Sequence, residues 1–351
     1  MKLGIIGFPG SGKTTLFNAL TGQNLPVGMV GEQARGANIG VAFVPDERLE
    51  FLGKKYRPRK LTYATVQFVD QAFVKEEGSK KRELGEEFLN NIRPVDALMH
   101  VVRCFEHPVY GNADPMDDIE ALESELILAD YLVVEKRIER LKHERQKGKV
   151  GNPREIELLE KALSILENER PLRFSEDIAS APELRGYSFL SAKPVIIVLN
   201  EEEDKSSAVD TNEIEKSYGP CLSMKGKLEM ELSQLSGDEV KDFMEDFGLN
   251  SLAKERVIRV SYDTLRLISF FTIGKDEVRA WTIKNGTIAL KAAGVVHSDM
   301  EKGFIRAEVV AFDDFKECGS YQIAQKKGKV RLEGKNYVVK DGDIINFRFN
   351  I

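Results

Sequence analysis

Short apolar runs alternate with stretches of helical spacing through most of the chain. The apolar run of residues 2–6 leads into a glycine-rich turn, and Leu16, Phe17 and Leu20 then follow at helical spacing. Other strand-like runs cover residues 63–69, 97–103 and 194–199. Because helical stretches separate these runs, the pattern predicts an α/β domain built on a mainly parallel sheet.

Residues 117–174 have a different pattern, which predicts an inserted helical hairpin. Apolar residues recur at spacings of three and four in two blocks, and residues 147–153, KGKVGNP, interrupt them. We predict an antiparallel hairpin of coiled-coil type. The alternative is two ordinary surface helices on the sheet, because each helix is short for a coiled coil. The repeating residues are Ile127, Tyr131, Val134, Ile138 and Leu141, then Ile156, Leu159, Leu163 and Leu166.

From Val278 onward, short strands punctuated by glycine and Asn-Gly predict a small, mostly β domain. A chain of 351 residues also exceeds the size at which a single core stops growing. The predicted domains are 1–116 with 175–265, the hairpin 117–174, and the C-terminal domain 266–351.

Composition narrows the classes of partner. No apolar run approaches the roughly 18 residues of a membrane span, and no signal peptide is evident, so we expect a cytoplasmic protein without a membrane partner. The net charge of −6 argues against general nucleic-acid coating, and we expect no DNA sequence specificity. Residues 270–351 carry 14 Lys and Arg against 11 Asp and Glu, a net charge of +3, so an RNA partner is expected there.

The sequence GFPGSGKTT, residues 7–15, matches the phosphate-loop pattern G-x-x-x-x-G-K-[ST] between a predicted strand and a predicted helix. In such a loop the backbone N–H groups surround a β-phosphate, while Lys13 reaches the β and γ oxygens and the Thr14 hydroxyl ligates Mg²⁺. The residues expected to bind a nucleotide here are Gly7, Pro9, Gly10, Ser11, Gly12, Lys13, Thr14 and Thr15.

A phosphate loop alone leaves small-molecule kinases, ATPases and GTPases open. Residues 193–204, KPVIIVLNEEED, contain an apolar strand ending in Asn200, with Glu203 where guanine-specific enzymes carry the aspartate of N-K-x-D. Glutamate is one methylene longer than the aspartate that reads guanine N1 and N2, so ATP stays open beside GTP. The alternative for residues 201–204 is a solvated acidic turn.

Several longer segments closely resemble the Obg-like ATPase, or YchF-type, family, and the resemblance covers nearly the whole chain. They are GFPGSGKTTLFNALTG (7–22), VPDERL (44–49), FLNNIRPVDALMHVVRCFE (88–106), DIEALESELILAD (118–130), LNEEE (199–203), FFTIGKDEVRAWTIKNGT (270–287), AAGVVHSDMEKGFIRAEV (292–309) and RLEGKNYVVKDGDIINFRFN (331–350).

The resemblance implies a P-loop NTPase domain with an inserted coiled-coil hairpin and a C-terminal β-grasp TGS domain. It also implies a slow, Mg²⁺-dependent switch that prefers ATP to GTP and associates with a ribosome or ribosomal subunit, with RNA contacts through the TGS-like domain. By match, Asn200, Glu203, Ser223 and Met224 lie on the base side. Lys13 and Asp70 are the expected catalytic residues, and Asp70 is expected to hold Mg²⁺ through a water.

Both switch regions depart from the family pattern. Ala34 stands near the place of a threonine that senses Mg²⁺, and Asp70-Gln71-Ala72-Phe73 lacks the glycine of D-x-x-G. Because such groups assist phosphoryl transfer, we expect feeble hydrolysis. The alternatives are a non-hydrolysing nucleotide-binding module or a GTP-preferring GTPase. A metabolite kinase is disfavoured by Asn200 with Glu203 and by the TGS-like domain.

Two other features admit a simpler explanation. His100, in the apolar run LMHVV, is expected to be a core histidine rather than a catalytic base. The basic stretch 326–335 lies near Trp281, Tyr321 and Tyr337 in sequence, which is typical of single-stranded RNA binding. A solvated hairpin is the alternative, and the TGS resemblance favours RNA or ribosome contact.

Overall fold

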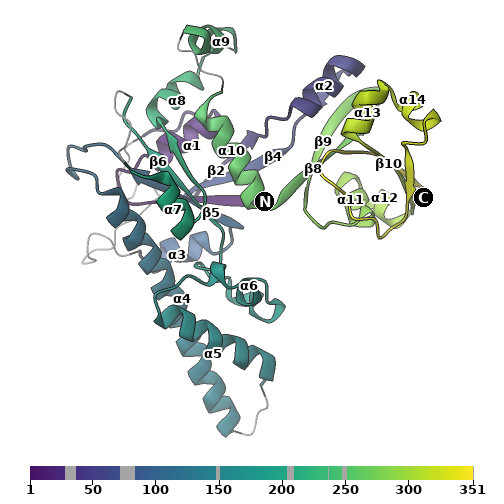
Figure 1. The fold of residues 1–351 in the computed structure, drawn as a ribbon. Helices are drawn as coiled ribbons and strands as arrows, with labels where there is room; N and C mark the ends of the chain where they lie inside the picture. The colour runs from purple at the N-terminus through teal and green to yellow at the C-terminus, as the bar shows by residue number, and fades with distance from the viewer. Residues whose placement is uncertain are drawn as a thin grey trace. The chain divides into compact units, whose positions relative to one another are not determined.

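The computed structural model describes residues 1–27, 37–71, 84–147, 151–203, 209–235, 237–246 and 251–350. They form two compact units, of which the first comprises residues 1–41 with 67–257 and the second residues 42–66 with 258–351. Figure 1 traces the backbone of both units.

A six-stranded sheet organises the first unit, in the order β2-β4-β1-β5-β6-β7. The central strand β1 is parallel to both of its neighbours, β4 and β5, and β6 and β7 continue in the same direction. The carboxyl ends of these five strands therefore meet at one edge of the sheet, where α/β proteins bind ligands. The strands are β1 (Lys2–Ile6), β2 (Ala37–Phe43), β4 (Thr65–Gln71), β5 (Ala97–Arg103), β6 (Val195–Asn200) and β7 (Cys221–Met224).

Helices cover the sheet with their apolar sides. Helix α1 (Lys13–Thr21) buries Leu16, Phe17 and Leu20, as the spacing predicted, and it packs against α8 (Gly226–Leu232). The remaining helices of this unit include α3 (Glu86–Ile92), α4 (Pro115–Gln146), α5 (Pro153–Glu167), α6 (Glu176–Ala179), α7 (Thr211–Ser217) and α9 (Gly237–Asp246). The chain then enters α10 (Ala253–Thr264), which leads into the second unit.

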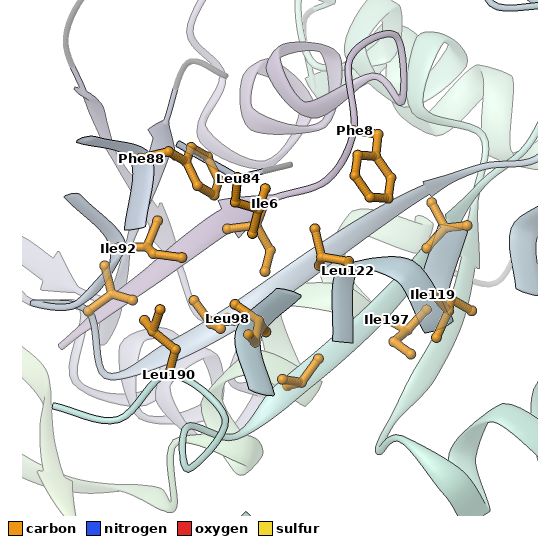
Figure 2. Close-up of a cluster of buried hydrophobic side chains, with 14 of the residues drawn as sticks. Ile6, Phe8, Leu84, Phe88, Ile92, Leu98, Ile119, Leu122, Leu190 and Ile197 are labelled. Carbon is orange, nitrogen blue, oxygen red and sulfur yellow. The ribbon is translucent and has the colours of Figure 1, made fainter. Parts of the chain in front are cut away.

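One core cluster joins the sheet to α3 and the first half of α4. Figure 2 shows Ile119 and Leu122 of α4 beside Leu98 and Ile197 of the neighbouring strands β5 and β6. Phe8, the second residue of the phosphate loop, is buried in the same cluster. The Phe8 side chain therefore anchors the phosphate loop in the apolar core.

The second half of α4 leaves the sheet and packs against α5, which gives the projecting hairpin of Figure 1. Its core contains the predicted repeat residues, among them Val134, Ile138 and Leu159. The predicted insertion is thus confirmed. The alternative of surface helices packed on the sheet holds only for the first half of α4, because the second half packs with α5 in a separate core.

The second unit is built on another six-stranded sheet, ordered β11-β10-β12-β8-β9-β3. Its strands are β3 (Lys60–Thr62), β8 (Leu267–Ile273), β9 (Glu277–Lys284), β10 (Phe304–Ala311), β11 (Arg331–Glu333) and β12 (Asp343–Phe349). Its helices are α2 (Glu47–Tyr56), α11 (Ala289–Val296), α12 (Ser298–Lys302), α13 (Phe312–Cys318) and α14 (Tyr321–Lys326). The predicted fold class, a parallel α/β domain with a helical insertion and a second sheet domain, is confirmed.

The predicted domain boundaries stay a prediction, and they differ from the two compact units at residues 42–66. We assigned residues 42–66 to the nucleotide domain, whereas they pack within the second unit. The centroids of the Phe51 and Phe312 rings are 5.6 Å apart, and the Lys60 N–H donates to the Asp276 carbonyl oxygen at 2.9 Å. These partners are remote in sequence, so no local pattern indicates them.

Among the residues that the structure describes, we find no helix with the length and apolar character needed to cross a membrane.

Candidate nucleotide-binding site

The phosphate loop joins β1 to α1, and its backbone requires glycine at three places, one of which, Gly10, has a φ angle of 79°. Gly7 and Gly12 have positive φ angles of 147° and 92°. A Cβ atom on Gly7 would lie 2.4 Å from the Val101 carbonyl oxygen, and one on Gly12 would lie 2.1 Å from Asn200 Nδ2. Helix α1 begins at Lys13, and Gly12, the residue at its N-cap, supplies no side-chain hydrogen bond. Its first N–H groups are thus available to an anion.

The Lys13 amine lies inside the curve of this loop. Its Nζ donates to the Gly7 carbonyl oxygen at 2.9 Å and to the Phe8 carbonyl oxygen at 3.1 Å. Burial lowers the pKa of Lys13 to about 8, although the nearby Asp70 carboxylate acts in the opposite direction. Burial makes the protonated Lys13 amine costly in free energy. An anionic ligand would lower this cost by supplying the missing counter-charge.

Thr14 and Asp70 meet at the other end of the loop. Thr14 Oγ1 donates a hydrogen bond of 3.0 Å to Asp70 Oδ2. Asp70 lies near the end of β4, opposite Ile5 of β1, so the sheet register sets this distance. Burial raises the pKa of Asp70, and the hydrogen bond from Thr14 opposes that shift. A hydroxyl and a carboxylate are oxygen donors of the kind that Mg²⁺ takes in phosphate sites.

Within the described ranges, no group of three His, Cys, Asp or Glu side chains could hold a metal without help. Thr14 and Asp70 fit a magnesium site to which a bound nucleotide would contribute phosphate oxygens.

Asn200, at the end of β6, links two loops. Its Nδ2 donates to the Ser11 carbonyl oxygen at 2.9 Å, and its Oδ1 accepts from the Gly226 N–H at 3.0 Å. The amide is buried, and Gly226 begins α8. Asn200 therefore holds the phosphate loop and the loop after β7 together, an arrangement that the sequence match did not describe. Gly226 itself carried no sequence signal.

The other predicted base-side residues are distributed around Asn200. Glu203 is exposed and pairs with Lys227, whose Nζ lies 3.2 Å from Glu203 Oε1. Met224 is buried opposite Asn200, while Ser223 is partly exposed opposite Leu199. Pro9 and Thr15 are partly exposed in and after the loop. The structure brings the phosphate and base segments to one edge, and the binding roles of the individual residues stay predictions.

His100, on β5, is buried and lies opposite Ile6 of β1. Burial lowers its pKa to about 3, and the nearby Lys13 charge acts in the same direction. This agrees with the core role expected for it. The switch residues Ala34 and Phe73 lie outside the described residues, as does the side chain of Gln71.

Sequence reasoning missed the turn after β5. Gly10 of the phosphate loop lies against the Tyr110 ring, and Arg103 holds the carbonyl groups around that turn. A single tyrosine in a polar loop gives no motif, so only the long-range contact reveals it.

A strand, a glycine loop closed on a lysine, and an asparagine at the end of β6, two strands away in the same sheet, define a P-loop NTPase. Two family models match: "50S ribosome-binding GTPase" over residues 2–137, and a YchF GTPase C-terminal family, described as "Protein of unknown function (DUF933)", over residues 267–350. The chain belongs to the YchF family of Obg-like P-loop proteins.

Two relatives show how far the similarity extends. A "Ribosome-binding ATPase YchF" of Haemophilus ducreyi is 41% identical over 360 residues, covering 100% of this chain and 99% of the relative. The protein of that name in Bacillus subtilis is 41% identical over 365 residues, covering 100% of both. The solved "Structure of the Schizosaccharomyces pombe YchF GTPase" matches with a TM-score of 0.84 and 30% identity, covering 99% of this chain and 97% of that one.

Proposed function

We propose that this chain is a cytoplasmic, ATP-preferring P-loop NTPase that hydrolyses the β–γ phosphoanhydride slowly with Mg²⁺ and associates with ribosomes. The observation that carries the proposal is the preformed site, in which Lys13 lies inside the glycine loop and Thr14 contacts Asp70. The names of the full-length bacterial relatives support both the ATPase activity and the ribosome partner. An RNA contact through the basic, TGS-like C-terminal residues belongs to the same proposal.

Each residue of the site has a definite task in this mechanism. Lys13 exchanges its two carbonyl contacts for β and γ oxygens and neutralises charge that develops in the transition state. Thr14 and Asp70 would hold Mg²⁺, which supplies further neutralisation when bound. Asn200 keeps the loop in place through Ser11 and so positions the phosphates for in-line attack.

The preference for ATP rests on Glu203. Guanine recognition needs a carboxylate placed in the plane of N1 and N2, and glutamate reaches farther than the aspartate that does this. Glu203 also pairs with Lys227 at an exposed position, a weak interaction that a base could replace. The relatives are named both ATPase and GTPase, so direct titration with both nucleotides is required.

A second candidate is a nucleotide-binding module that does not hydrolyse, favoured by Ala34 and Phe73 in the two switch sequences. Single-turnover assays of the full chain with ATP, with and without ribosomes, separate the two. Phosphate release that needs Lys13 supports the NTPase. Tight ATP binding without phosphate release in either condition would leave only the module.

A further inference from the structure

The turn formed by residues 107–111 lies on the phosphate loop, and none of the roles above uses it. The His107 N–H donates to the Gly111 carbonyl oxygen at 3.0 Å, and the Gly111 N–H donates back to the His107 carbonyl oxygen at 2.8 Å. The Val109 N–H also donates to His107 Nδ1 at 3.1 Å. These three hydrogen bonds within residues 107–111 define the conformation of the turn, so its shape does not depend on a ligand.

Arg103, the last residue of β5, fixes the turn to the sheet. Its Nη1 donates at 2.6 Å to the carbonyl oxygens of both Phe105 and Gly111, and its Nη2 donates at 3.1 Å to that of Asn112. The guanidinium is buried, a costly placement that three carbonyl partners offset. The side chains of the turn are therefore held in a defined position relative to the end of β5, which reduces the cost of binding.

The Tyr110 ring rests directly on the phosphate loop. A Cβ atom on Gly10 would lie 2.6 Å from the nearest ring carbon, so this contact requires a glycine. The tyrosine nonetheless remains 42% exposed, which leaves part of the ring available to a ligand. The His107 ring supports it, with 4.8 Å between the ring centroids.

The position along the loop indicates which part of a nucleotide the ring faces. Asn200, predicted to lie on the base side, donates to the carbonyl oxygen of Ser11, the residue after Gly10. The metal end is marked by Thr14, three residues after Ser11, and by Asp70, which accepts a hydrogen bond from it. Tyr110 thus flanks the same part of the loop as Asn200, on the side predicted for the nucleoside rather than for the γ-phosphate.

We propose that Tyr110, supported by His107, binds the nucleoside half of the nucleotide by stacking on its base or ribose. This inference rests on the proposed nucleotide site and adds a residue to it. Aromatic stacking accepts any base because every base has a π-face. Tyr110 therefore contributes affinity for ATP and GTP alike, while the choice between them belongs to Glu203.

The test compares ATP with inorganic tripolyphosphate, which has the phosphates without the nucleoside. In the full chain, Tyr110→Ala should raise the Kd for ATP about tenfold and leave that for tripolyphosphate unchanged. Tyr110→Phe should retain ATP binding because the ring remains. Val109→Ala is the matched control, since Val109 is 76% exposed on the same turn and has no ring. Thermal melting of each variant checks that it folds.

Each result decides between the claims. Unchanged ATP affinity in Tyr110→Ala, or equal weakening of ATP and tripolyphosphate, would overturn the stacking role while leaving the nucleotide site intact. Failure of the unmodified chain to bind either compound would overturn the proposed function and this inference with it.

Discussion

The Thr14 hydroxyl and the Asp70 carboxylate lie 3.0 Å apart although 56 positions separate them in the chain. The contact exists because β1 and β4 are adjacent and parallel, which brings the start of α1 to the end of β4. Two oxygen donors are thereby paired before nucleotide or metal binds. This relationship gives the first prediction.

Asp70→Asn should remove most of the gain in ATP affinity that Mg²⁺ provides. The amide keeps the size of the side chain but loses the charge, and a charged hydrogen-bonded contact is worth about 1.5–3 kcal/mol, or roughly tenfold to a hundredfold in affinity. ATP binding without Mg²⁺ should be retained. Calorimetric titration with Mg²⁺ and with a chelator measures both quantities.

Glu213→Gln is the control, because Glu213 is an exposed acid on α7. It should leave the magnesium effect intact. A full magnesium effect in Asp70→Asn would contradict the assignment of that carboxylate to the metal.

The second prediction concerns the proton on Lys13, whose pKa burial lowers to about 8 from 10.5. Between these values the unfolded chain holds more protons than the folded chain, so the contribution of Lys13 to stability rises with pH there. Below pH 8 Lys13 is charged in both the folded and the unfolded chain, so the destabilisation caused by burying that charge is fully present. A bound polyphosphate restores the charge, so ATP binding near pH 8.5 should take up protons, and affinity should fall as pH rises further.

Titrations at pH 8.5 in two buffers of different ionisation enthalpy measure that uptake. Lys13→Met should show none and should bind ATP roughly tenfold to a hundredfold more weakly. Identical heats for the unmodified chain in both buffers would show that Lys13 is already fully protonated at that pH.

Local patterns predicted those parts of the molecule whose cause is local. The run 2–6, the glycine loop and the spacing of Leu16, Phe17 and Leu20 each specify their own element, and the alternation of elements specifies the parallel sheet. The comparison with the N-K-x-D motif indicated Asn200, although its contact with Ser11 spans 189 positions.

Two features depended on packing between distant segments. Residues 42–66 join the second unit through partners such as Asp276 and Phe312, and neither end of these contacts has a distinctive pattern. Tyr110 reaches Gly10 only because β5 lies beside β1, so its role near the loop follows from the sheet order.

The third prediction is that Glu203→Asp shifts nucleotide preference towards GTP. The substitution restores the N-x-x-D spacing, and a well-placed bidentate contact to a base discriminates by about 1–3 kcal/mol. We expect the ratio of the ATP and GTP dissociation constants to move about tenfold in favour of GTP. Competition titrations against a fluorescent ATP analogue measure the ratio. Glu202→Asp, the same change one residue earlier, should not alter it, and an equal shift in both variants would contradict a base contact by Glu203.

The fourth prediction concerns the attachment of the hairpin. Asp130 of α4 is fully buried, and its carboxylate accepts from the N–H groups of Leu190 and Ser191 at 2.9 and 2.7 Å and from the Ser191 hydroxyl at 2.8 Å. Arg93 lies 3.6 Å away. Removing the carboxylate would leave these donors buried without their acceptor. The donors belong to the segment just ahead of β6.

Asp130→Ala should therefore lower the free energy of unfolding by about 3–5 kcal/mol, whereas Glu139→Ala, at an exposed position on the same helix, should change it by less than about 0.5 kcal/mol. Asp130→Asn should be intermediate, because its amide oxygen still accepts one of the bonds. Urea denaturation of the full chain gives the three values. If Asp130→Ala proved as stable as Glu139→Ala, the apolar face of α4 alone would hold this helix, and its hydrogen bonds to Leu190 and Ser191 would contribute nothing measurable.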